Sequence, residues 1–505
     1  MLKMTISLDD AAGPWTLTNG TWRCGTSVIK PVQHPALETI RTALDSGLQL
    51  TIRERCPGRA GQPHTGDWPG DFITVELGPR TVQLEAGERG VAPLYLSVKS
   101  DSLRASWDLA DLRHNLTSSR LNAREIARLL TMRFRYGHDT LFADAHTLTE
   151  RSTAVFTHDG LHMTYPPAAH HSEARELRAE ADPVAGYERL LEAAVASRVY
   201  DPARTCIELS GGLDSANVGA TLGSLHPGQI TASAMLLPDE VGIQQAIRRT
   251  QLITLLRLGP DAPVSFAGRL PLSPSGRRGS GIPVTPYEDP YDEAKTVLLG
   301  QLARDGVRTT FTGIGGDEMV ARTAAEFPHP PLGTELKPMP WISKQTLEVS
   351  ANSEEETAPA AVLNEMTLTA QACAAPAFLR AGIWPVHPLA HPDLITFGEW
   401  LPLRWRRHKR LHQARLEALG CPPGLLEPKL RENFTPVIQM AIREHGLPLI
   451  SRILRSGSQL IDCGFIDPDG LAEVHKRLSD GGDFRERETE LYGMIAMDLA
   501  LRTFA

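Results

Sequence analysis

The stretch ELSGGLDSANV, residues 208–218, carries the pattern that decides the fold of this chain. It follows the strand-like run TCIEL (205–209) and leads into a helical pattern from about Ala216. Two glycines allow a tight turn with inward-pointing backbone N–H groups, and two serines add hydroxyl donors. These groups face the positive end of the following helix, so the turn predicts a site for an anion such as pyrophosphate. The four turn residues are Ser210, Gly211, Gly212 and Ser215.

Asp214 lies inside this anion-binding turn. Its carboxylate would repel a phosphate unless a cation lay between them, so its position implies Mg²⁺. The turn lacks the Gly-Lys-Ser/Thr sequence of a Walker loop, which excludes that class of phosphate site.

A second glycine-rich turn, TGIGGDEM (312–319), follows the strand-like run RTTFTG (308–313). Gly313 and its neighbours permit close backbone approach, and Asp317 supplies another carboxylate. Ligands of open α/β sheets bind at the carboxyl ends of the strands. Both turns are expected at that edge, where Asp214 and Asp317 would share Mg²⁺.

Strand and helix patterns alternate around these turns. The apolar run TASAMLL (231–237) precedes a helical pattern over 241–258, which predicts an α/β domain with a parallel sheet and crossover helices. A Pro/Gly/Ser-rich stretch at about 260–292 predicts a long loop near the active edge, where loops often close over substrate. The chain from 360 onward is expected to be mainly helical.

Residues 1–165 read as a separate α+β domain. Alternating runs at 71–77, 80–87 and 93–100 predict strands in hairpins, and the pattern at 122–134 predicts a helix. The polar, charged segment 166–182 has the composition of a linker. The second domain is expected to span 183–505.

Composition excludes several functional classes. The 505 residues include 60 acidic and 52 basic side chains without a Lys/Arg block, which argues against nucleic acid as a partner. No apolar run approaches the roughly 18 residues of a membrane helix, and the acidic N-terminal stretch does not resemble a secretory signal. The six cysteines form no CxxC pair, which argues against disulfides and zinc. A cytoplasmic protein without membrane attachment is expected.

With both turns in place, the chain resembles the asparagine synthetase superfamily, whose signature is SGGLDS followed about a hundred residues later by G-x-G-G-D-E. Members are ATP-pyrophosphatases that form an acyl-adenylate and let an amine attack it. The resemblance covers nearly the whole chain. It includes the segments 88–97 and 139–151 of a glutaminase-like domain and the segments 384–402 and 408–434 of the helical end.

The resemblance implies a role for each matching residue, with ATP and Mg²⁺ as cofactors. Lys429 would stabilise negative charge on the adenylate and on the tetrahedral intermediate, and Arg431 would contact a phosphate or a substrate carboxylate. Lys429 is one of only nine lysines, so chance is a poorer explanation for it. Lys409 is expected at the surface or facing phosphate. The remaining assignments are Leu209 and Met235 beside adenine, Ser210, Gly211, Gly212, Asp214 and Ser215 around pyrophosphate, Thr312 and Gly313 near the α-phosphate, and Asp214 and Asp317 on Mg²⁺.

The chain departs from glutamine-dependent members at its first residues. Those enzymes use a cysteine at position 2, whereas this chain has Leu2, and their Asn-Gly-Glu segment has no counterpart here. The first domain is therefore expected to be a degenerate, Ntn-type glutaminase-like sandwich without glutaminase activity, and the amine must arrive with the substrate.

Two groups of relatives supply their own amine. Lasso-peptide cyclases join the N-terminal amine of a precursor peptide to an Asp or Glu side chain, forming a macrolactam and releasing AMP and pyrophosphate. We expect this natural-product ligase, with a leader peptidase and a leader-recognition protein as partners. The alternatives are a β-lactam- or carbapenam-type small-molecule synthetase, a non-catalytic scaffold, and a tRNA-modifying enzyme.

Overall fold

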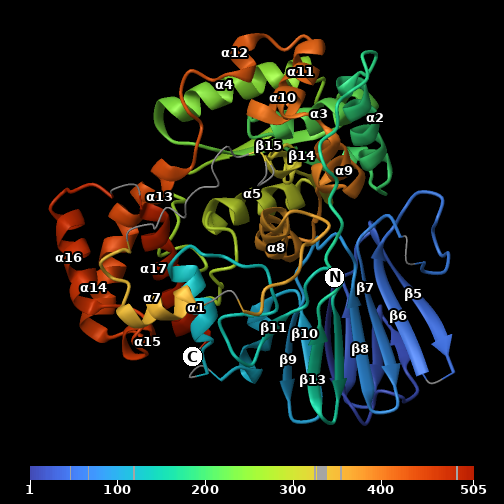
Figure 1. The fold of residues 1–505 in the computed structure, drawn as a ribbon, viewed down its shortest axis with the longest axis vertical. Helices are drawn as coiled ribbons and strands as arrows, with labels where there is room; N and C mark the ends of the chain where they lie inside the picture. The colour runs from blue at the N-terminus through green and yellow to red at the C-terminus, as the bar shows by residue number, and fades with distance from the viewer. Residues whose placement is uncertain are drawn as a thin grey trace.

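Two antiparallel sheets occupy most of the first 165 residues of the computed structural model, at lower right in Figure 1. Their apolar faces contribute to one core, in which Leu2 and Leu103 of one sheet belong to the same cluster as Val75 and Leu84 of the other. The predicted strands are confirmed here. The structure describes residues 1–45, 47–65, 68–117, 120–322, 326, 338–352, 355–484 and 487–504.

The seven-stranded sheet has the order β11-β9-β10-β1-β4-β3-β2 and the six-stranded sheet the order β13-β12-β8-β7-β6-β5. In the first, the bounds are β1 Leu2–Ser7, β2 Thr16–Thr18, β3 Thr21–Cys24, β4 Ser27–Pro31, β9 Tyr95–Lys99, β10 Ser102–Ser106 and β11 His146–Thr147. In the second, they are β5 Leu37–Leu44, β6 Gly47–Glu54, β7 Phe72–Gly78, β8 Thr81–Ala86, β12 Thr153–Thr157 and β13 Gly160–Thr164.

The helix predicted at 122–134 is shorter than expected. Helix α1 (Ala123–Leu130) begins where the Asn122 side chain accepts a hydrogen bond from the Glu125 backbone N–H. It ends before Met132, whose φ of 56° is incompatible with a right-handed helix. Figure 1 shows α1 among C-terminal helices, and it packs on α7 (Lys344–Ala351) and α17 (Glu488–Phe504). The packed core therefore crosses the boundary that the sequence suggests at residue 165.

A parallel sheet of order β16-β15-β14-β17-β18 forms the centre of the second half. Strand β16 lies in the stretch predicted as a loop, and β18 escaped prediction because three residues show no useful periodicity. Helix α3 packs on one face of β14, while α5 and α8 cover the other face. The bounds are β14 Thr205–Glu208, β15 Thr231–Leu236, β16 Asp261–Ser265, β17 Thr309–Phe311, β18 Trp384–Val386, α3 Leu213–Leu225, α4 Asp239–Leu255, α5 Asp292–Arg304 and α8 Glu365–Arg380.

The chain beyond residue 360 is mainly helical apart from β18, as predicted. None of the helices in the described ranges is long and apolar enough to cross a membrane. The remaining helices are α2 Pro183–Ala196, α6 Gly316–Met319, α9 Pro392–Trp400, α10 Leu403–Arg406, α11 Arg410–Ala418, α12 Pro423–Leu426, α13 Thr435–Ala441, α14 Leu447–Ser456, α15 Gln459–Asp462 and α16 Pro468–Ser479.

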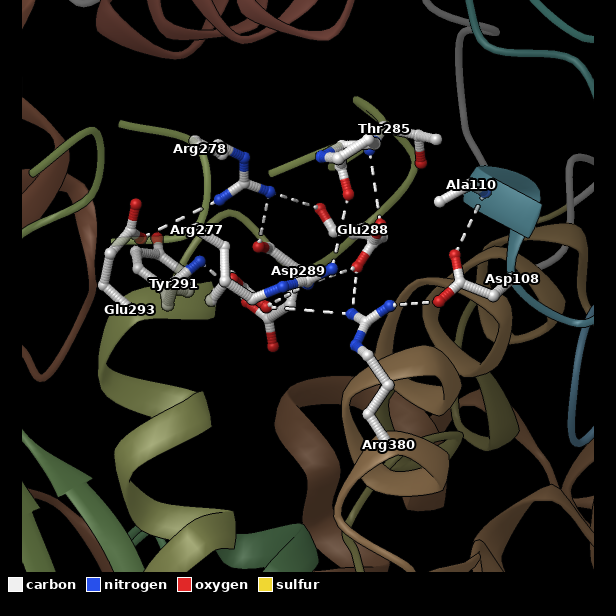
Figure 2. Close-up of polar contacts among 12 residues, drawn as sticks. Asp108, Ala110, Arg277, Arg278, Thr285, Glu288, Asp289, Tyr291, Glu293 and Arg380 are labelled. Carbon is white, nitrogen blue, oxygen red and sulfur yellow. Dashed lines mark hydrogen bonds and ion pairs between the residues drawn. The ribbon is translucent and has the colours of Figure 1, made fainter. Parts of the chain in front are cut away.

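The Pro/Gly-rich segment between β16 and α5 is fastened by buried charges (Figure 2). Arg278, only 2% exposed, donates hydrogen bonds to the backbone carbonyls of Glu288 and Asp289. Arg380 of α8 pairs with the Glu288 carboxylate and, at 2.9 Å, with Asp108 of the β-rich region. These contacts tie the segment to both halves of the chain, whereas the sequence predicted a long loop of the kind that often closes over substrate.

Candidate functional site

The two glycine-rich turns meet at the carboxyl edge of the parallel sheet. Strands β14 and β17 are direct neighbours, so the turns that follow them come together as predicted. A methyl group on Gly316 would lie 2.5 Å from Asp214 Cγ, and one on Gly313 would lie 2.8 Å from the Ser215 backbone nitrogen. Only residues without a Cβ allow this approach.

Lys409 joins the two acidic side chains of the turns. Its Nζ lies 2.6 Å from Asp214 Oδ2 and 2.6 Å from Asp317 Oδ1. Burial raises the pKa of Asp214 to about 6, against the opposing effect of the Lys409 ammonium. Burial would lower the pKa of Lys409, but the two carboxylates outweigh it and hold that pKa above its usual value. The sequence placed Lys409 only at the surface or near phosphate, since neither aspartate is close to it in the chain.

The first turn is held from behind by one face of α4. Gln245 Nε2 donates to the Ser210 carbonyl at 2.9 Å, and Arg248 Nη2 donates to the Gly211 carbonyl at 3.0 Å. Both side chains are nearly inaccessible, at 2% and 5% exposure. These two hydrogen bonds fix the turn from behind, and within the turn the Gly212 N–H donates to Ser210 Oγ at 3.2 Å. The sequence analysis missed both residues, although their spacing of three on a predicted helix was a usable signal.

The same helix secures the segment that carries Lys429 and Arg431. Gln244 exchanges two hydrogen bonds of 2.9 Å with the Leu430 backbone, and Arg248 pairs with Glu432 at 2.5 Å. Lys429 and Arg431 are exposed and border a hollow of about 390 Å³ that Gly211 and Gly212 also line. The structure therefore brings both predicted residues to the first glycine-rich turn.

A second hollow of about 300 Å³ opens on the other side of the turn. Leu209 lies outside it, because its side chain is fully buried in the core cluster that contains Val218. Gly211 lines only the first hollow. Predicted residues that line the second hollow are Ser210, Gly212, Asp214, Ser215, Met235, Thr312 and Gly313, and lining residues that the sequence analysis did not assign are Glu208, Ala234, Leu298, Ile314 and Phe434.

An ion pair that the sequence analysis did not predict lies at the lining of the second hollow. Lys295 of α5, 4% exposed, places Nζ 2.5 Å from Glu208 Oε1 and 4.6 Å from the centre of the Phe378 ring. Burial would lower the pKa of Lys295, but Glu208 outweighs it and raises that pKa. The scarcity of lysine, which drew attention to Lys429, applied equally to Lys295.

The acidic groups at the sheet edge suit a divalent cation shared with phosphate. Asp214 Oδ1 is buried without a hydrogen-bond partner, and the carboxylates of Asp214 and Asp317 converge on one positive charge. The described ranges contain no cluster of three or more His, Cys, Asp or Glu side chains that could hold a metal alone. Mg²⁺ typically takes one or two carboxylates and completes its shell with water and substrate phosphates, so the residues present fit it.

The parallel sheet, its helices and the two turns at its carboxyl edge define an α/β class of fold. A family model described as Asparagine synthase matches residues 186–251, a range that contains the first turn and most of α4. No curated protein matches the chain. The match supports a place in the asparagine synthetase superfamily, whose members are ATP-dependent ligases.

Proposed function

We propose that this chain is an AMP-forming amide synthetase that closes a macrolactam ring in a precursor peptide, as lasso-peptide cyclases do. ATP-dependent amide-bond formation is the activity that the family match suggests. The observation that carries the proposal is the convergence of both turns, Lys409 and the Lys429 segment around one pair of hollows.

The first half of the reaction would form the acyl-adenylate. A substrate carboxylate oxygen attacks the α-phosphorus of ATP, and the bond to pyrophosphate breaks. The backbone N–H groups of the turn at Ser210 to Gly212 would receive the departing pyrophosphate. Asp214 and Asp317 would hold Mg²⁺, which when bound neutralises phosphate charge.

The second half would form the amide. The N-terminal amine of the same peptide attacks the activated carbonyl, AMP departs, and the amine loses a proton to solvent. Lys429, exposed at the rim of the first hollow, is suited to stabilise the negative charge that develops on oxygen. Arg431 beside it would contact a phosphate or the substrate carboxylate.

Access to the site supports a large substrate. Lys429 and Arg431 are exposed and line the first hollow, so an extended chain can reach the turn without entering a closed cavity. Position 2 holds Leu2, whose side chain carries no nucleophile, which supports a β-rich region without glutaminase activity. Cys206 is buried against Ser233, and burial raises the pKa of its thiol to about 12, which disfavours a thiol-dependent tRNA reaction.

The test is incubation of the full chain with a candidate precursor peptide freed of its leader, ATP and Mg²⁺. We expect loss of one water from the peptide by mass spectrometry and release of equimolar AMP. Asp214→Ala and Asp317→Ala should abolish AMP formation. The control Asp261→Ala, which removes a carboxylate on β16 outside both hollows, should retain it. ATP–pyrophosphate exchange without peptide cyclisation would favour a small-molecule synthetase, and absence of exchange would favour a scaffold.

We further propose that the enzyme acts in the cytoplasm with a leader peptidase and a leader-recognition protein. A peptide whose leader must be removed before its N-terminal amine is free requires both activities upstream. Genes for a short precursor and a protease beside this one would support the assignment, and genes of a small-molecule pathway would oppose it.

A further inference from the structure

One carboxylate stands among the apolar side chains of the second hollow. Glu208 is the last residue of β14, and its side chain is 21% exposed. Side chains alternate along a strand, so Glu208 shares the face of Cys206, whose cluster includes Leu298 and Met235. The lining of the hollow therefore combines these apolar side chains and Glu208 with residues of both glycine-rich turns, which include Asp214.

Lys295 neutralises this carboxylate from behind. The ammonium bonds Glu208 Oε1, while Oε2 accepts no hydrogen bond from any residue in the described ranges. Because the pair has no net charge, it favours a neutral hydrogen-bond donor over a substrate ammonium. A carboxylate accepts hydrogen bonds and cannot donate them, so a ligand carbonyl at the same point would be repelled.

We propose that Glu208, held by Lys295, selects the base of the bound nucleotide by accepting a hydrogen bond from the exocyclic amine of adenine. The apolar side chains of Met235, Leu298 and Phe434 would pack on the planar ring. Glu208 thus determines specificity for a 6-amino purine over a 6-oxo purine. This inference rests on the proposed function, because it requires that the hollow binds ATP.

The test compares ATP with ITP, whose purine differs only at and beside position 6. Displacement of a ribose-labelled fluorescent ATP from the full chain with Mg²⁺ gives both affinities. We expect the wild type to prefer ATP by about tenfold or more, because a mismatched polar group in a binding site is costly. Glu208→Gln should reduce this preference to about threefold or less, since an amide can donate to a carbonyl. The control Asp261→Asn changes a carboxylate of the same sheet that pairs with Arg249 of α4, and it should retain the preference for ATP.

Three results with the wild type and Glu208→Gln would overturn the inference. They are a wild type that does not discriminate, a Glu208→Gln variant with the wild-type ratio, and a variant that changes only the ratio of ATP to 2′-deoxy-ATP, which would assign Glu208 to the ribose. Glu208→Asp keeps the charge beside Lys295 and serves if the amide fails to fold. This variant should bind ATP more weakly and bind ITP with unchanged affinity. An unchanged affinity for ATP would again overturn the inference. A wild type that binds no nucleotide would instead refute the proposed function.

Discussion

Replacing Gly316 by alanine should separate the two turns while leaving the fold intact. The added Cβ would lie 2.7 Å from Asp214 Cβ, which cannot rotate away, and ordinary contact begins at 3.4 Å, so the turns must part by about 0.7 Å, the difference between these distances. A displacement of about 1 Å at a reacting centre can lower a rate about a hundredfold. We therefore expect ATP–pyrophosphate exchange to fall by about that factor.

The assay is exchange of labelled pyrophosphate into ATP, measured beside a thermal unfolding curve. Gly493→Ala is the matched control, because no atom lies within 4 Å of its added Cβ and it lies inside α17. That control should retain exchange and gain about 0.4 to 1 kcal/mol of stability. Exchange by Gly316→Ala within twofold of the wild type, at an unchanged melting temperature, would refute the reasoning.

Three further outcomes are expected. Lys429→Met should lower the rate of amide formation by a factor of about 10² to 10³ with little change in melting temperature. Lys476→Met is the control and should change neither the rate nor the melting temperature. Equal effects of the two substitutions on the rate would contradict the role of Lys429. Arg248→Met should destabilise the chain by about 3 to 5 kcal/mol in urea unfolding, because it removes the ion pair with Glu432 and the hydrogen bonds to the Gly211 and Leu425 carbonyls. A loss below about 1 kcal/mol would contradict these contacts as a main anchor. Burial raises the pKa of Glu293 to about 7, against the opposing effect of Arg278, so the folded state binds its proton more tightly than the unfolded state. The stabilising contribution of Glu293 is complete below the unfolded pKa of 4.5 and is lost as pH rises through 7. The free energy of unfolding of Glu293→Gln should therefore rise by about 1 to 3 kcal/mol relative to that of the wild type between pH 5 and pH 8. A difference that does not change with pH would contradict this reasoning.

Most elements of the fold could be predicted because their signals are local. The runs that became β7, β8, β14 and β15 show apolar patterns bounded by Gly and Pro, and the two turns follow strands directly. Strands β16 and β18 were missed, because pairing with a neighbour, rather than their own residues, makes them strands. The early end of α1 depends on the left-handed backbone of Met132, which no propensity indicates.

The candidate site likewise contains residues that the sequence could predict and residues that it could not. The turns and both aspartates are contiguous motifs, so their chemistry could be inferred from residue type and order. The spacing of Gln245 and Arg248 could have placed them on one helix face, but a helical pattern does not identify the backbone carbonyls that such a face contacts. The side chain of Leu209 lies in the core on the face opposite Glu208, as strand alternation directs, and its place beside adenine stays a prediction.

The sequence by itself determined that a parallel sheet carries two glycine-rich turns and that two carboxylates follow its strands. Only the tertiary structure decided which positive charges meet them. Lys409 reaches Asp214 and Asp317 from 195 and 92 positions away, counted along the chain, and Lys295 reaches Glu208 from 87 positions away. The physical reason is that ion pairs depend on distance in space and on burial, and both are set when distant helices pack on the sheet.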